Sequence, residues 1–158
     1  MTRGRLRFVA LTLLTLVAAW AVARVDKGHA WLGLTLILML LTLAIWGVGL
    51  RIIGRVQTPI SYMVLHHWTE NVLILQALGG VALLIMGSRM SSGLFPWDHY
   101  IYGSLFPLLA LISGRVAGLR REREYVGMAW GAFFAAALSL QALATGCELV
   151  IDASCLAR

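Results

Sequence analysis

Five long apolar runs divide the chain and limit what it can fold into. They cover residues 8–23, 31–53, 62–87, 98–118 and 126–146. A helix that crosses about 30 Å of hydrocarbon needs roughly 20 mostly apolar residues, and irregular backbone cannot face lipid because its polar groups find no hydrogen-bond partner there. The runs therefore predict an all-α fold, a polytopic transmembrane bundle of four to five helices in a single membrane domain.

The overall composition agrees with a membrane location. Of the 158 residues, 60% are hydrophobic and 13% are charged, which leaves too little polar surface to cover a soluble globule of this size. The formal net charge of +6 comes largely from basic residues that flank the apolar runs, where they report topology. The expected partners are the lipid bilayer and other membrane-protein subunits, and no nucleic acid is expected.

The basic residues favour a cytoplasmic N-terminus. In that orientation nine arginines lie on the cytoplasmic side and four basic residues lie outside, as the positive-inside rule requires. The tail, residues 147–158, is then exoplasmic. Residues 1–24 are either a retained first span or a secretory signal cleaved after Ala23, and cleavage leaves four spans in the same orientation.

Two cysteines lie in the tail. Cys147 and Cys155 follow the last apolar run, on the predicted oxidising side, where a local disulfide can form. The alternative is two free thiols in a cytoplasmic tail, which requires the reverse topology. One pair without CxxC spacing matches neither a redox centre nor a zinc site, so no metal is expected beyond a possible haem iron.

Motifs of soluble enzymes do not occur in the chain. It contains no Gly-rich phosphate loop, GxSxG elbow or HExxH, and no connection is long enough to build a catalytic domain. We therefore expect no independent catalytic activity.

The third run carries the most polar residues of the five. In SYMVLHHWTENVLILQALGG, at about 100° per residue, one side of the helix collects Tyr62, His66, Thr69, Glu70, Gln76 and Gly80, and His67 and Asn71 lie about 100° around it. An ionised side chain at mid-membrane costs at least about 2.5–3.5 kcal/mol, so Glu70 needs a partner. That partner is either Arg115, reaching from the fourth run as an ion pair, or His66, one turn away, in a proton-handling couple.

The fourth run predicts a packing face. Its small residues recur at helical spacing and let another helix approach closely; the stripe consists of His99, Tyr102, Gly103, Phe106, Ala110, Ser113 and Gly114. The alternative is a cofactor or quinone-like ligand beside Tyr102 and Gly103. Pro107 should bend this helix near its middle.

The four histidines are the candidate cofactor ligands. A b-type haem is held by imidazoles from helices on either side of the macrocycle. His29 and His99 each open a span near the predicted exoplasmic interface, so they can face each other across a haem edge. His66 and His67 lie toward the cytoplasmic side and have no histidine opposite them. The alternative for His29 and His99 is an interfacial role beside Trp31 and Trp97 in an aromatic belt.

The order of these motifs resembles a known family. An early His66 or His67, later glycines in the same run, HYIYG at 99–103 and ATG at 144–146 are similar to small bacterial cytochrome b561-like four-helix proteins over residues 60–146. The resemblance implies haem b held by paired histidines on neighbouring helices, for which His66 or His67 and His99 fit the ligand type, in a bacterial plasma membrane (cell inner membrane). The chain departs from the family's pattern because the predicted topology places these histidines at opposite membrane faces.

Three functions follow from these features, in order of preference. The first is a small accessory or anchor subunit of an energy-transducing, respiratory or photosynthetic, electron-transfer complex. The second is a haem b electron-transfer protein that uses the histidines near the membrane faces. The third is a small proton-coupled transporter component centred on Glu70.

Overall fold

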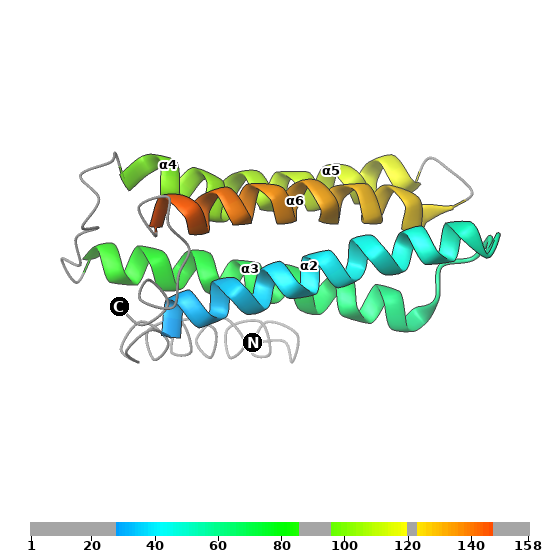
Figure 1. The fold of residues 1–158 in the computed structure, drawn as a ribbon, viewed down its shortest axis with the longest axis horizontal. Helices are drawn as coiled ribbons and strands as arrows, with labels where there is room; N and C mark the ends of the chain where they lie inside the picture. The colour runs from blue at the N-terminus through cyan, green and yellow to red at the C-terminus, as the bar shows by residue number, and fades with distance from the viewer. Residues whose placement is uncertain (1–27, 86–95, 120–122, 147–158) are drawn as a thin grey trace, which may run out of the picture.

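The computed structural model describes residues 28–85, 96–119 and 123–146 (Figure 1). This part of the chain is helical throughout and contains no strand, and its elements are α2 (Gly28–Ile52), α3 (Ile60–Ile85), α4 (Pro96–Tyr100), the π-helical segment η1 (Ile101–Leu105), α5 (Phe106–Leu119) and α6 (Glu124–Gly146). The predicted first span at 8–23 and the tail with Cys147 and Cys155 lie outside the described residues.

Three of the described helices are long and apolar enough to cross a membrane. They are Gly28–Ile52, Asp98–Leu119, which runs through η1, and Glu124–Thr145. Large apolar side chains such as Ile45, Val48 and Phe134 are exposed on the outer faces, as expected for helices that contact lipid. The all-α prediction is confirmed for the described part of the chain.

The helices lie side by side in two pairs (Figure 1). The segment α4–η1–α5 runs beside α6, and α2 crosses α3 on the other side. Helix α6 packs against both α5 and α2, whereas α3 packs chiefly against α2. Helix α6 is therefore the central element, and α3 meets α5 over a smaller area.

Helix α2 ends in a motif that its sequence encodes. Gly54 has a φ of 71°, a left-handed conformation that glycine adopts without a Cβ penalty. The Arg55 N–H donates to the Leu50 carbonyl and the Gly54 N–H to the Arg51 carbonyl, both at 3.1 Å. This pair of bonds is a Schellman cap, and it turns the chain so that α3 can return antiparallel to α2.

The core lies where α2 and α6 meet. Its members are mostly leucine and alanine at helical spacing, among them Leu36, Leu40, Leu43, Leu111, Ala132 and Ala135. Two buried tyrosines tie neighbouring helices to α2 and to the turn after it. Tyr62 donates to the Leu43 carbonyl of α2 at 3.0 Å, and Tyr125 donates to the Arg55 carbonyl of the turn at 2.6 Å. These bonds help to fix α3 and α6 relative to the end of α2.

Glycines bring α5 and α6 into backbone contact. A Cβ built on Gly114 would lie 2.5 Å from the Gly127 carbonyl oxygen and 2.7 Å from the Gly131 Cα. A Cβ on Gly118 would meet the Glu124 carbonyl in the same way. Only glycine fits at these positions, because the neighbouring atoms belong to backbone and cannot rotate aside.

The π-helical segment η1 precedes a proline. Pro107 is buried in the first turn of α5, and proline has no N–H to donate to the carbonyl one turn earlier. A local widening of the helix accommodates this missing bond. The consequence is that residues before η1 and residues after it do not follow one continuous 3.6-residue period.

Candidate functional site

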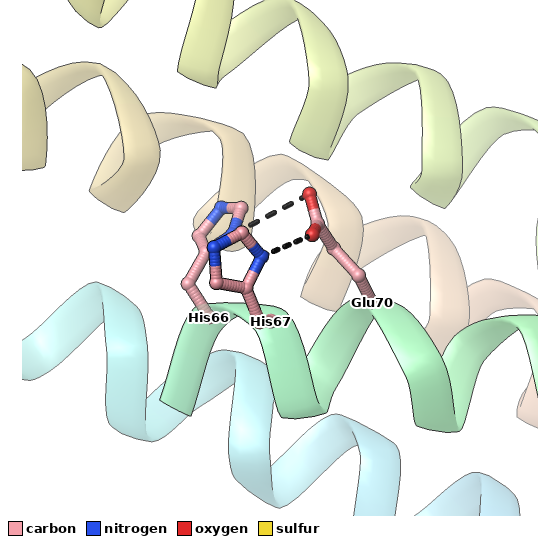
Figure 2. A group of neighbouring side chains, drawn as sticks. All are labelled: His66, His67 and Glu70. Carbon is pink, nitrogen blue, oxygen red and sulfur yellow. Dashed lines mark hydrogen bonds and ion pairs between the residues drawn. The ribbon is translucent and has the colours of Figure 1, made fainter. Parts of the chain in front are cut away.

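Three side chains with ligand atoms meet on α3 (Figure 2). His66, His67 and Glu70 each offer one such atom, and all three atoms lie within 4.8 Å of one another. His67 Nδ1 donates a hydrogen bond to Glu70 Oε2 at 3.0 Å, and His66 Nδ1 lies 3.5 Å from Glu70 Oε1. We call these residues the His66–His67–Glu70 cluster.

Both partners predicted for Glu70 lie near it. Arg115 Nη1 of α5 is 3.9 Å from Glu70 Oε1, and the Arg115 side chain is 35% exposed. A pair this long and this exposed contributes at most about 1 kcal/mol to stability. His67, placed beside Asn71 by the helical pattern, instead turns its ring toward Glu70, so the cluster joins both histidines to one carboxylate (Figure 2).

His66 is the least satisfied member of the cluster. It is fully buried, and within the described part of the chain neither of its ring nitrogens has a hydrogen-bond partner. The neighbouring Thr69 hydroxyl donates to the Leu65 carbonyl at 2.8 Å and so is directed elsewhere. A buried polar group left without a partner costs about 1–3 kcal/mol, so His66 is the member of the cluster with unused hydrogen-bonding capacity.

A second group of histidines lies at the other end of the helices. His29, in the first turn of α2, and His99, in α4, have ring centroids 6.3 Å apart and ring planes inclined at 56°. Figure 1 shows why they meet: the start of α2 and the α4 segment lie at the same end of the molecule. We call them the His29–His99 pair.

Each ring of the His29–His99 pair is held through one nitrogen. His99 Nδ1 donates to the Ala142 carbonyl of α6 at 2.9 Å. His29 Nε2 lies 3.3 Å from the Gln76 side-chain amide of α3, whose Oε1 is buried without a partner. Because amide orientation follows from hydrogen bonding, turning this amide lets Oε1 accept the His29 Nε2–H. His29 Nδ1, buried and unpartnered among the described residues, is then free to bind a ligand.

Small residues make room for the pair. A Cβ on Gly80 would lie 3.4 Å from His29 Cε1 and 3.4 Å from Tyr100 Cε1, and one on Gly33 would lie 3.2 Å from Gln76 Nε2. The Tyr100 hydroxyl points at the Gly80 carbonyl, 3.4 Å away. Glycine at these positions lets α2, α3 and α4 enclose the two rings.

The spacing of the two rings in the His29–His99 pair is close to that of two imidazoles bound to one metal ion. Histidine nitrogens bind metal ions at about 2.0–2.1 Å, so two rings on opposite sides of one ion have centroids about 6 Å apart, close to the 6.3 Å found here. A hydrogen bond from the second ring nitrogen to a carbonyl is the usual way to orient such ligands. His66 and His67 do not fit this role together, because they are consecutive on one helix and both face Glu70.

Sequence reasoning named all four histidines, Glu70 and Arg115, but missed three contributors to the pair. These are Gln76 as the partner of His29, the Ala142 carbonyl and Tyr100. The sequence does contain a signal for the contact of Gln76 with His29. Because α2 and α3 are antiparallel and joined by a short connection, the start of α2 lies beside the end of α3. Gly47 accordingly faces Tyr62, and His29 faces Gly80.

Comparison of the chain with protein-family models, with curated proteins and with solved structures finds no match.

Proposed function

We propose that this protein is a small integral membrane electron-transfer component that holds a b-type haem between His29 and His99. The single observation that carries the proposal is the His29–His99 pair itself, two rings from different helices at 6.3 Å. It favours haem binding over an accessory role without a cofactor, because an anchor subunit has no need of two histidines oriented in this way.

The proposed architecture is a polytopic bundle in a bacterial plasma membrane. Helix α3, with 26 residues, is about 39 Å long at 1.5 Å per residue, so it supplies a further span beside the three apolar helices. With the N-terminus cytoplasmic, the His29–His99 pair lies near the exoplasmic face and the His66–His67–Glu70 cluster lies toward the cytoplasmic side. The bundle has five spans if the run at 8–23 is retained and four if it is cleaved.

The chain's own residues would bind and orient the cofactor. The two imidazoles would hold the iron, while the Ala142 carbonyl orients the His99 ring and the Gln76 amide orients the His29 ring. When bound, a haem iron supplies reversible one-electron transfer. A chain of this size with one such centre would exchange electrons with other membrane subunits or with a membrane-soluble carrier. This role is compatible with a place in an energy-transducing complex, as the sequence predicts.

The test is an optical spectrum of the full chain, purified in mild detergent from haem-replete cells. We expect a reduced-minus-oxidised difference spectrum with a b-type α-band and a haem content near one per chain. A spectrum without that band, from protein whose circular dichroism is helical, would overturn the proposal.

A further inference from the structure

We propose a second site on this chain: His66, His67 and Glu70 bind a divalent transition-metal ion of the Zn²⁺ class. The sequence predicts no metal other than haem iron, because its cysteine pattern matches no zinc site. The cluster is assembled differently, from two imidazoles and one carboxylate on consecutive turns of α3 (Figure 2). The proposal does not depend on haem at the His29–His99 pair, which lies at the other end of α3.

The distances in the cluster suit one ion. Zn²⁺ binds histidine nitrogen at about 2.0–2.1 Å and carboxylate oxygen at about 2.0–2.2 Å, so two such ligands at a tetrahedral angle are about 3.3–3.5 Å apart. The separation is 3.0 Å between His67 Nδ1 and Glu70 Oε2 and 3.5 Å between His66 Nδ1 and Glu70 Oε1. With one ligand atom from each residue, the three atoms lie within 4.8 Å of one another, so small side-chain rotations bring them around one ion. Two histidines and one glutamate form a known three-ligand set for zinc, with a fourth position left for water or another ligand.

His66 supplies an independent reason to expect a ligand. It is fully buried, and both of its ring nitrogens lack partners in the described residues. The near nitrogen faces Glu70 but lies 3.5 Å from it. A metal ion between His66 and Glu70 would satisfy that nitrogen, which no group of the described chain does.

An ion can reach the site without opening the core. The His67 side chain is 48% exposed and Glu70 is 19% exposed, so one side of the cluster faces outward. Besides the two histidines, Arg115 also lies beside Glu70. Its positive charge opposes a bound cation, but its length and partial exposure let it turn outward.

The experiment measures Zn²⁺ binding to the full chain, purified without a histidine tag, by isothermal titration calorimetry. The visible spectrum of bound Co²⁺ then reports the coordination. We expect one Zn²⁺ per chain at this site and weakening of at least about 10–100-fold in His67→Ala and in Glu70→Gln. Arg115→Gln should bind several-fold more tightly, since a competing charge is removed. Asn71→Ala, an exposed neighbour on the same helix, is the matched control and should bind like the wild type.

Three results would overturn the proposal. They are absence of Zn²⁺ binding by the folded wild type, unchanged binding in both His67→Ala and Glu70→Gln, and weaker binding in Arg115→Gln. Zn²⁺ held by the His29–His99 pair is distinguished by His29→Ala, which should leave binding at the cluster intact. Helical circular dichroism of each variant shows that a lost affinity is not a lost fold.

Discussion

His99→Ala and His29→Ala should each reduce the haem content of the purified protein by at least about 10–100-fold. Changing a group that merely orients a metal ligand already weakens metal binding by that factor, and these variants remove an axial ligand outright. His99 is also the ring held by the Ala142 carbonyl, so its removal takes away an imidazole that α6 orients. Haem per chain, measured after extraction, gives the result directly.

His67→Ala is the control for these variants. His67 is a largely exposed histidine of the other cluster, so its removal should leave the haem content unchanged. Imidazole added to His99→Ala should restore part of the haem absorption by filling the vacated position. Full haem content in both His29→Ala and His99→Ala, with loss in His66→Ala, would place the haem at the other end of the helices and refute the assignment.

Gly114→Ala should be strongly destabilising at the interface between α5 and α6. The new Cβ would lie 2.5 Å from the Gly127 carbonyl oxygen, and because that atom belongs to backbone the two helices must separate. Overpacking of this kind costs about 1–3 kcal/mol, and more where the neighbours cannot yield. The free energy of unfolding, measured by titrating detergent micelles with a denaturing detergent, should fall by at least that amount.

Gly49→Ala is the same chemical change, but it should not lower the stability of the protein. A Cβ on Gly49 of α2 meets nothing within 4 Å, and alanine is a better helix former than glycine by about 0.5–1 kcal/mol. This variant should therefore unfold at the wild-type midpoint or above it. Equal stability of the two variants would contradict the close approach of α5 and α6.

The helices were predictable because the bilayer sets their length. The run at 31–53 became α2 (Gly28–Ile52) and the run at 126–146 became α6 (Glu124–Gly146). Each helix nevertheless begins two or three residues before its run. The first turn of a helix tolerates polar residues such as Glu124, and hydropathy counts such residues as part of the connection.

The packing face of the fourth run was only partly predictable. Gly103, Ala110 and Gly114 do face α6, as their small size suggests. Phe106 and Ser113, placed in the same stripe by a constant 100° step, are exposed. These two residues share the uninterrupted helix α5 with Ala110 and Gly114, so they mark the edge of the packing stripe, which was predicted too wide. The π-helical segment η1 changes only the angle between Gly103 and the residues after it, and a proline in the sequence indicates a distortion without specifying its form.

Residue types at the site were predictable, but their contacts were not. Glu70 needed partners on energetic grounds, and His66 and Arg115 both lie near it. The turn of His67 toward Glu70 depends on a side-chain rotamer that helical spacing does not determine. The contact of Gln76 with His29 depends on the register between α2 and α3, which follows from the cap at Gly54 and the short connection after it.

Low-temperature electron paramagnetic resonance of the oxidised protein would show whether His29 and His99 together hold one haem iron. Two axial imidazoles hold ferric haem in a low-spin state, whereas a single axial histidine leaves it high-spin. We expect a low-spin signal in the wild type that is lost, or replaced by a high-spin signal, in His29→Ala and in His99→Ala. A low-spin signal that survives unchanged in either variant would contradict this assignment.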